Sequence, residues 1–89
     1  MHRLRYTDAA RHDLIRLPGN YRQRLRRVIE ALAEQPTPPS AKVLRERPGR
    51  YRIRVDHWRL IYRGDDADGG VLILRVRRKT GPETYDDIE

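Results

Sequence analysis

The chain lacks several features on which whole classes of protein depend. It contains no cysteine among its 89 residues, so disulfide scaffolds, thiolate zinc sites and cysteine nucleophiles are excluded. The longest unbroken apolar run, residues 71–74, is far shorter than the roughly 20 residues that a membrane-spanning helix needs. No apolar segment follows residues 1–5, so no secretory signal is visible and we expect a cytoplasmic protein without membrane contact. The three histidines lack metal-ligand spacing and no glycine-rich phosphate loop is present, so we expect neither a metal nor a cofactor.

Lysine is also scarce, although the chain is strongly basic. The 20 cationic residues outnumber 13 acidic ones and give a net charge of +7, yet only Lys42 and Lys79 are lysines. The other cations are arginines, whose planar guanidinium groups bind phosphate through two parallel hydrogen bonds. The composition therefore indicates a polyanionic partner. The length allows a single domain over residues 1–89 with a thin core.

The first half of the chain predicts one strand and two helices. Residues 4–6 alternate apolar and polar side chains, as a short strand does. Thr7 is placed to cap a helix that Pro18 stops, and a second helix is expected from Asn20, with Gln23 completing a capping box. Two short helices joined by a tight turn should form a hairpin. The expected apolar stripe of the first helix consists of Ala10, Leu14 and Leu17. That of the second helix consists of Tyr21, Leu25, Val28, Ile29 and Leu32.

The second half has the two-residue period of strands. Residues 50–55 alternate arginine with apolar side chains, residues 56–57 resemble a tight turn, and residues 58–63 form the expected returning strand. Residues 64–70 are interpreted as an acidic, solvated loop. Residues 71–76 are almost continuously apolar, which is typical of a central strand covered on both faces. The predicted class is α+β with the element order β-α-α-β-β-β, followed by a short acidic element over residues 82–89.

The positive charge is concentrated on the predicted strands. Residues 42–63 carry a net +6 and residues 75–79 a net +4, whereas residues 80–89 carry −4. If the strands are neighbours, their polar faces merge into one basic surface. Like charges on facing strand positions repel, so stability alone does not explain the ladder of Arg50, Arg52 and Arg54 with Arg59 across the turn. We therefore interpret the ladder as a phosphate-binding surface.

Three segments in this order resemble the RelE/ParE toxin superfamily. They are Tyr51-Arg52-Ile53-Arg54-Val55, Trp58-Arg59-Leu60-Ile61-Tyr62, and residues 71–76 leading to Tyr85. The upstream residues Ala9, Ala10, Leu14, Leu17 and Pro18, with Leu32, Pro36, Ala41 and Leu44, fit the same pattern, so the resemblance covers nearly the whole chain. It implies a small, twisted, mostly antiparallel sheet packed against a helical hairpin. It also implies a cognate antitoxin that wraps the toxin.

The resemblance implies one of two activities. RelE-like members cut messenger RNA in the ribosomal A site: the ribose 2′-OH attacks the adjacent phosphate, which needs a base, cations and an acid. ParE-like members poison DNA gyrase without nuclease chemistry. A degenerate RNA-binding member is the third possibility. The full cationic set favours the RelE-like endoribonuclease, whereas the lack of a lysine base favours the other two.

The resemblance assigns roles to individual residues. The catalytic set is Arg52, Arg54, Arg59, Lys79 and Tyr85, in which Arg59 binds the scissile phosphate and Tyr85 stacks on a base. The RNA-binding set is Arg50, His57, Arg75, Arg77 and Arg78; the resemblance carries over only Arg78, and the other four are inferred from their places on the basic strands and at the turn.

Three positions depart from the family pattern and put the proton chemistry in doubt. Arg54 stands where the family has a lysine base, and arginine does not deprotonate. Arg78 replaces a histidine and Arg77 a glycine. Lys79 is the first candidate proton acceptor, because neighbouring cations favour a neutral amine. His57, at the hairpin turn, is the second.

Overall fold

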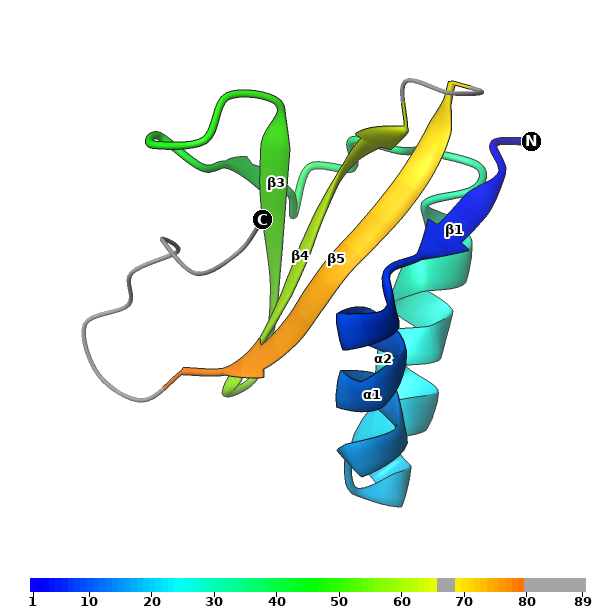
Figure 1. The fold of residues 1–89 in the computed structure, drawn as a ribbon, viewed down its shortest axis with the longest axis vertical. Coiled ribbons are helices and arrows are strands. Elements are labelled where there is room, and N and C mark those ends of the chain that lie inside the picture. The colour runs from blue at the N-terminus through cyan, green and yellow to red at the C-terminus, as the bar shows by residue number, and fades with distance from the viewer. Residues whose placement is uncertain (66–68, 80–89) are drawn as a thin grey trace.

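The computed structural model describes residues 1–65 and 69–79, and it forms two layers: a sheet and a pair of helices on one of its faces (Figure 1). The described elements are β1 (Leu4–Tyr6), α1 (Asp8–Arg16), α2 (Gly19–Ala31), β2 (Lys42–Val43), β3 (Arg50–Val55), β4 (Trp58–Asp65) and β5 (Gly70–Arg78). The α+β class, the helical hairpin and the order of the expected elements are therefore confirmed. The expected element over residues 82–89 lies outside the described residues.

The five strands have the spatial order β1-β5-β4-β3-β2. β1 is parallel to β5, and the other neighbouring pairs are antiparallel. The β3–β4 hairpin turns at Asp56 and His57, as expected, and Asp56 adopts a left-handed backbone conformation with φ 54°. Asp is one of the few non-glycine residues that tolerate this region, so the residue suits the turn.

The sequence predicts the cap of α1 correctly but not the cap of α2. The Thr7 side chain accepts a hydrogen bond from the amide of Ala10, which confirms its capping role. The capping box at Asn20 and Gln23 is wrong, because Pro18 occupies the cap position and no side chain caps α2. Pro18 has the extended backbone of a cap residue (φ −53°, ψ 145°), and its carbonyl oxygen accepts a 2.9 Å hydrogen bond from the amide of Arg22.

The main core lies between the helices and the sheet face that they cover, which we call the inner face. Both layers contribute regularly spaced apolar side chains to it. Leu25 and Ile29 of α2, and Leu32 directly after it, are fully buried, as expected of the second apolar stripe. Tyr21 and Val28 of the same stripe are partly buried and pack against the core. The core cluster comprises Ala10, Leu17, Leu25, Ile29, Leu32, Ile53, Val55, Leu60, Tyr62, Val71, Ile73 and Val76.

The opposite side of the sheet, which we call the open face, carries a second and smaller apolar cluster. It contains Leu44, Ile61 and Leu74, with Leu72 packed against them. A register shift leaves Leu74 between the partners of Ile61 and Tyr62, so β5 contributes buried side chains to both faces. The expectation that residues 71–76 form a strand covered on both faces is thus confirmed.

Two features of the sheet were not expected. β2 pairs with β3 over only two residues, too few to show an alternating pattern. β4 extends to Asp65, which is 6% exposed and forms a 3.1 Å ion pair with Arg5. The interpretation of Asp65 as part of a solvated loop is therefore wrong, because a partner 60 residues away in sequence compensates for burying its charge.

Candidate nucleic-acid interface

Three arginines face one another across the open face, next to the β3–β4 turn. Arg54 lies opposite Arg59, and Arg59 lies opposite Arg77. We call these three residues the arginine row. Neighbouring strands are about 4.8 Å apart, so the three Cα atoms span only about 10 Å. The prediction that the strands place their polar faces side by side is confirmed.

The members of the arginine row differ in their access to solvent. Arg54 is exposed, whereas Arg59 is only 4% exposed. The Arg59 guanidinium donates hydrogen bonds of 3.1 and 3.2 Å to the carbonyl oxygens of Asp56 and Trp58. Backbone carbonyls thus hold Arg59 at the turn, and Arg54 presents its charge to solvent directly.

Both candidate proton acceptors lie at this end of the sheet. The amide of Lys79 donates a 2.7 Å hydrogen bond to the carbonyl oxygen of His57. Both residues are exposed, and Arg78, also exposed, pairs with Trp58 one residue from this contact. The predicted residues His57, Arg78 and Lys79 therefore lie beside the arginine row, at what we call the turn end of the sheet.

A cluster of three side chains fixes the turn to α2. Asp56 accepts a 2.7 Å hydrogen bond from Arg24 and a 2.9 Å hydrogen bond from the Tyr21 hydroxyl. The bond from Arg24, and then that from Tyr21, holds the pKa of Asp56 below its ordinary value. The Arg24 guanidinium also lies 5.1 Å from the centre of the Tyr21 ring. Because Asp56 also accepts from Arg59 through its carbonyl, this cluster connects the helix to the arginine row.

Arg75, predicted to bind RNA, is held within the protein. Its guanidinium donates hydrogen bonds of 2.8 and 3.2 Å to the carboxylate of Asp13 in α1. The same carboxylate accepts a 2.9 Å hydrogen bond from the amide of Val76. Asp13 therefore joins α1 to the edge of β5, and the Arg75 side chain contributes to this junction.

The remaining predicted residues spread along the sheet. Arg52 lies between the two ends of β3, opposite Ile61 and Lys42. Arg50 lies four residues from Arg54, or about 13 Å along the strand, so it belongs to the other end of the sheet. There it lies opposite Arg63. Tyr85 lies outside the described residues.

Sequence reasoning missed several partners of these residues. Arg63 lies four residues after Arg59, on the same face of the predicted strand. The alternation of residues 58–63 was therefore enough to include it among the site residues. Asp13, Tyr21 and Arg24 lie in the helices and carry no local signal of their contacts with the sheet.

Across residues 1–65 and 69–79, no group of three or more His, Cys, Asp or Glu residues is placed to hold a metal ion. In the same ranges, no helix is long and apolar enough to cross a membrane.

The chain matches a known toxin family over most of its length. The model of the ParE toxin of the type II toxin–antitoxin system parDE matches residues 4–80. Toxin RelG of Mycobacterium tuberculosis (strain ATCC 25618 / H37Rv) is 36% identical over 77 residues, which cover 82% of this chain and 85% of RelG.

Solved structures agree with this assignment. A chain of the toxin–antitoxin complex RelBE2 from Mycobacterium tuberculosis superposes with a TM-score of 0.73 at 33% identity, covering 88% of this chain and 98% of the other. The isolated E. coli RelE toxin gives a TM-score of 0.80 at 22% identity, covering 98% of this chain and 94% of RelE, and so supports the fold. The chain belongs to the RelE/ParE toxin superfamily and is the toxin of a toxin–antitoxin system.

Proposed function

We propose that this toxin is a metal-independent endoribonuclease that cuts messenger RNA in the ribosomal A site. The observation that supports this most strongly is the arginine row, with three guanidinium groups on one sheet face beside Lys79 and His57. Cations held in fixed positions around a phosphate stabilise the charge that develops as a nucleophile adds to it.

The proposed reaction is an internal transfer at phosphorus. The ribose 2′-OH attacks the adjacent phosphate, the bond to the 5′ oxygen of the next nucleotide breaks, and the products are a 2′,3′-cyclic phosphate and a 5′-OH. A base takes the proton of the 2′-OH, and an acid gives one to the leaving oxygen. Lys79 is our first candidate for the base and His57 the second, because both are exposed at the turn end.

The arginines have different roles in this reaction. Arg54 is exposed and contacts the phosphate directly, together with Arg77, while Arg52 contacts the strand nearby. Arg59 is buried in the free toxin, so direct contact with the scissile phosphate requires its surroundings to shift when RNA binds. Arginine stays protonated in either case, so the row supplies charge and does not supply the base.

A second candidate function is inhibition of DNA gyrase. The observation that favours it is the match of residues 4–80 to the model of ParE toxins. In that case the arginine row would bind an acidic surface or DNA, and no bond would be cut.

One experiment separates the two functions. The toxin is incubated with translating ribosomes, and the message ends are mapped by primer extension. We expect cuts within the A-site codon, fragments with a 5′-OH, and no cut where the nucleotide before the scissile bond carries 2′-deoxyribose. Intact message together with trapped gyrase–DNA breaks would instead establish the gyrase function.

We also propose that a cognate antitoxin binds the helical hairpin. Tyr6, Leu14 and Ile29 line an apolar groove of about 510 Å³, and Ile15 beside them is 69% exposed. Arg11, Arg22 and Arg26 also line this groove. An amphipathic segment with acidic flanks complements both its apolar floor and its charge. RelBE2, in which the related chain occurs, is a toxin–antitoxin complex.

A further inference from the structure

Tyr21, in the first turn of α2, contacts two residues at the β3–β4 turn. Its hydroxyl donates a 2.9 Å hydrogen bond to the carboxylate of Asp56. Its ring lies 6.1 Å from the ring of Trp58, centre to centre, with an angle of 54° between the two planes. Aromatic pairs favour such tilted arrangements, which add to the energy gained from burying the rings. The helix therefore holds the turn through one polar and one apolar contact, both made by the same side chain.

The two residues that Tyr21 contacts also hold Arg59 in the arginine row. The carbonyl oxygens of Asp56 and Trp58 accept hydrogen bonds of 3.1 and 3.2 Å from the same nitrogen, Nη1, of the Arg59 guanidinium. The direction of these bonds depends on how the two peptide groups are oriented. A movement of either Asp56 or Trp58 would therefore change where the guanidinium points. The orientation of Arg59 is thus linked to Tyr21 by two routes, one through each of these residues.

The backbone of the turn needs support from its surroundings. Asp56 has φ 54°, in the left-handed region, which residues other than glycine occupy only at a cost in energy. Its carboxylate oxygen Oδ2 accepts the hydrogen bond from Tyr21 and another of 2.7 Å from Arg24. Tyr21 and Arg24 are three residues apart on one face of α2, and the Arg24 guanidinium lies 5.1 Å from the centre of the Tyr21 ring. Contacts from the helix therefore stabilise this conformation of the turn.

Tyr21 and Arg59 lie on opposite sides of the sheet. Tyr21 packs against the main core, which lies between the helices and the inner face. Arg59 belongs to the arginine row on the open face, where we place the phosphate. Tyr21 is therefore not placed to contact the phosphate, and any effect that it has on the reaction must pass through the turn. A residue that acts in this way is a positioning residue.

We propose that Tyr21 is a positioning residue for Arg59: by holding Asp56 and Trp58, it sets the orientation of the Arg59 guanidinium before RNA binds. The consequence for cleavage rests on the proposed function. A cation that is already oriented stabilises the developing charge without having to be ordered during the reaction. A reacting group displaced by about 1 Å can cost a factor of about 100 in rate. Loss of Tyr21 leaves the charge of the arginine row unchanged, so it should slow cleavage and leave RNA binding intact.

The direct test observes Arg59 in the free toxin, without RNA or ribosomes. The full chain is isotopically labelled, hydrogen exchange between the guanidinium and water is measured, and the Arg59 signals are assigned from their loss in Arg59→Lys. In the wild type this exchange should be slow, because Arg59 is 4% exposed and bonded to two carbonyl oxygens. Tyr21→Phe keeps the ring but removes the hydroxyl, and should accelerate the exchange at least about fivefold. Unchanged exchange in both Tyr21→Phe and Tyr21→Ala would overturn the inference.

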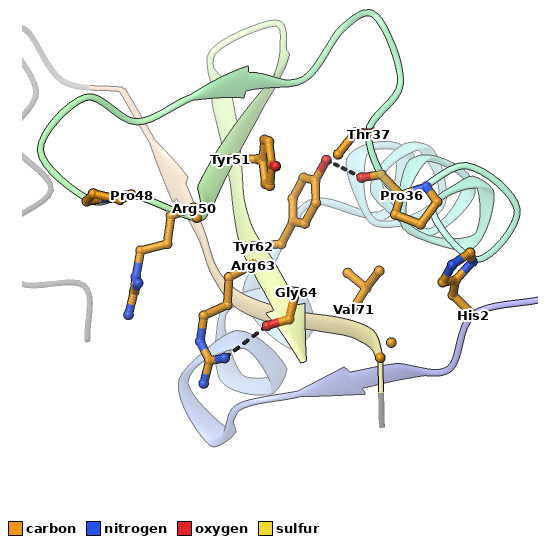
Figure 2. A pocket seen from close by; sticks show the side chains of 13 residues that line it. His2, Pro36, Thr37, Pro48, Arg50, Tyr51, Tyr62, Arg63, Gly64 and Val71 are labelled. Carbon is orange, nitrogen blue, oxygen red and sulfur yellow. Dashed lines mark hydrogen bonds between the residues drawn. The ribbon is translucent and has the colours of Figure 1, made fainter. Parts of the chain in front are cut away.

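Tyr62→Phe is the matched control, because it removes a tyrosine hydroxyl from a hydrogen bond elsewhere on the sheet. The Tyr62 hydroxyl donates a 2.7 Å hydrogen bond to the carbonyl oxygen of Pro36, beside a hollow at the end of the sheet opposite the turn end (Figure 2). Tyr62 is three residues from Arg59 along β4, or about 10 Å. The control should lower the stability of the fold, yet change the exchange at Arg59 less than about twofold. Equal acceleration in Tyr62→Phe and Tyr21→Phe would show that the exchange follows stability alone, and would overturn the inference.

The effect on catalysis is measured by single-turnover cleavage on translating ribosomes. With ribosomes at saturation, Tyr21→Phe should cleave about tenfold more slowly than the wild type, whereas the half-saturating concentration should change less than about twofold. In an Arg59→Ala background the same substitution should cost less than about twofold, because the group that it positions is gone. Equal losses with and without Arg59 would show that Tyr21 contributes only to stability.

Failure of the proposed function and failure of this inference give different results. If the wild type leaves the message uncut but Tyr21→Phe accelerates the exchange at Arg59, the ribonuclease is refuted and the positioning of Arg59 is retained. If the toxin cuts the message and the Tyr21 variants change neither the exchange nor the rate, only the positioning role is refuted.

Discussion

The amide of Lys79 donates a 2.7 Å hydrogen bond to the carbonyl oxygen of His57, which joins the end of β5 to the β3–β4 turn. This contact brings residues 22 positions apart to one end of the sheet. The arginine row, consisting of Arg54, Arg59 and Arg77, ends at the same place. A phosphate bound there would lie within reach of both exposed residues that are able to accept a proton.

We predict that Lys79→Ala reduces mRNA cleavage far more than it weakens RNA binding. A missing general base typically costs a factor of about 100 to 10,000 in rate, whereas one lost phosphate contact costs about tenfold in affinity. Single-turnover cleavage and RNA affinity are measured on the same preparation. Lys42→Ala is the matched control, since it removes the only other lysine from an exposed edge strand.

Equal losses of cleavage and binding in Lys79→Ala would show that Lys79 is only a phosphate contact. In that case His57→Ala becomes the decisive variant. If neither substitution separates cleavage from binding, no residue of the chain that we have identified acts as the base.

We predict that Asp56 stabilises the toxin at neutral pH and ceases to do so in acid. Its pKa is lowered by the hydrogen bonds from Arg24 and Tyr21, so the folded state favours the carboxylate. The stabilisation is therefore fully present above the ordinary pKa of 3.8 and disappears as the pH falls through the lower, folded-state value. The Tm of the wild type should exceed that of Asp56→Asn at pH 6, and the difference should vanish near pH 2.

Asparagine is the appropriate substitution at position 56, because it tolerates the positive φ of this turn. A Tm difference that is constant with pH would mean that the side-chain charge is irrelevant. The cluster is exposed, so added salt should reduce the difference.

We predict that Asp13→Ala destabilises the fold by about 2 kcal/mol, because it leaves the Arg75 guanidinium and the Val76 amide without this acceptor. Chemical denaturation measures the loss. Asp13→Asn retains an acceptor oxygen and should cost less. If Asp13→Ala unfolds at the same denaturant concentration as the wild type, the junction between α1 and β5 contributes nothing to stability.

We predict that Ile15→Asp weakens antitoxin binding at least about tenfold, because it places a charge in the apolar groove and repels acidic flanks. Ile15 is 69% exposed, so the fold should tolerate the change. Calorimetry with the purified antitoxin measures the affinity. Val43→Asp is the control: Val43 is 61% exposed on β2, away from the groove, and an equal loss there would place the antitoxin elsewhere.

The elements of this fold were predictable where their pattern is local. The alternation of residues 50–55 and 58–63 determines which side chains share a face, and Thr7 marks the start of α1. The basic surface followed from the same alternation once the strands were assumed to be neighbours. Each of these features depends on residues that are close in sequence.

The features that sequence reasoning missed depend on distant pairs. Asp65 is buried because Arg5 lies beside it, and Arg75 is held because Asp13 lies beside the edge of β5. The register shift at Leu74 follows from the packing of both sheet faces and not from a local motif. No alternation predicts which arginine will be buried, so the 4% exposure of Arg59 could not be foreseen.

The proposed role of the arginine row as the active site of a ribonuclease is tested most directly by the rate at which row variants cut mRNA on translating ribosomes. The double variant Arg54→Ala with Arg77→Ala is compared with Arg16→Ala with Arg27→Ala, which removes the same charge from exposed helix positions. We expect the row variant to lose about 100-fold or more in cleavage rate, as when preorganised charge is removed from a transition state, and the control to lose less than about threefold. Equal losses in the two variants, or a wild-type toxin that leaves the message uncut, would contradict the account.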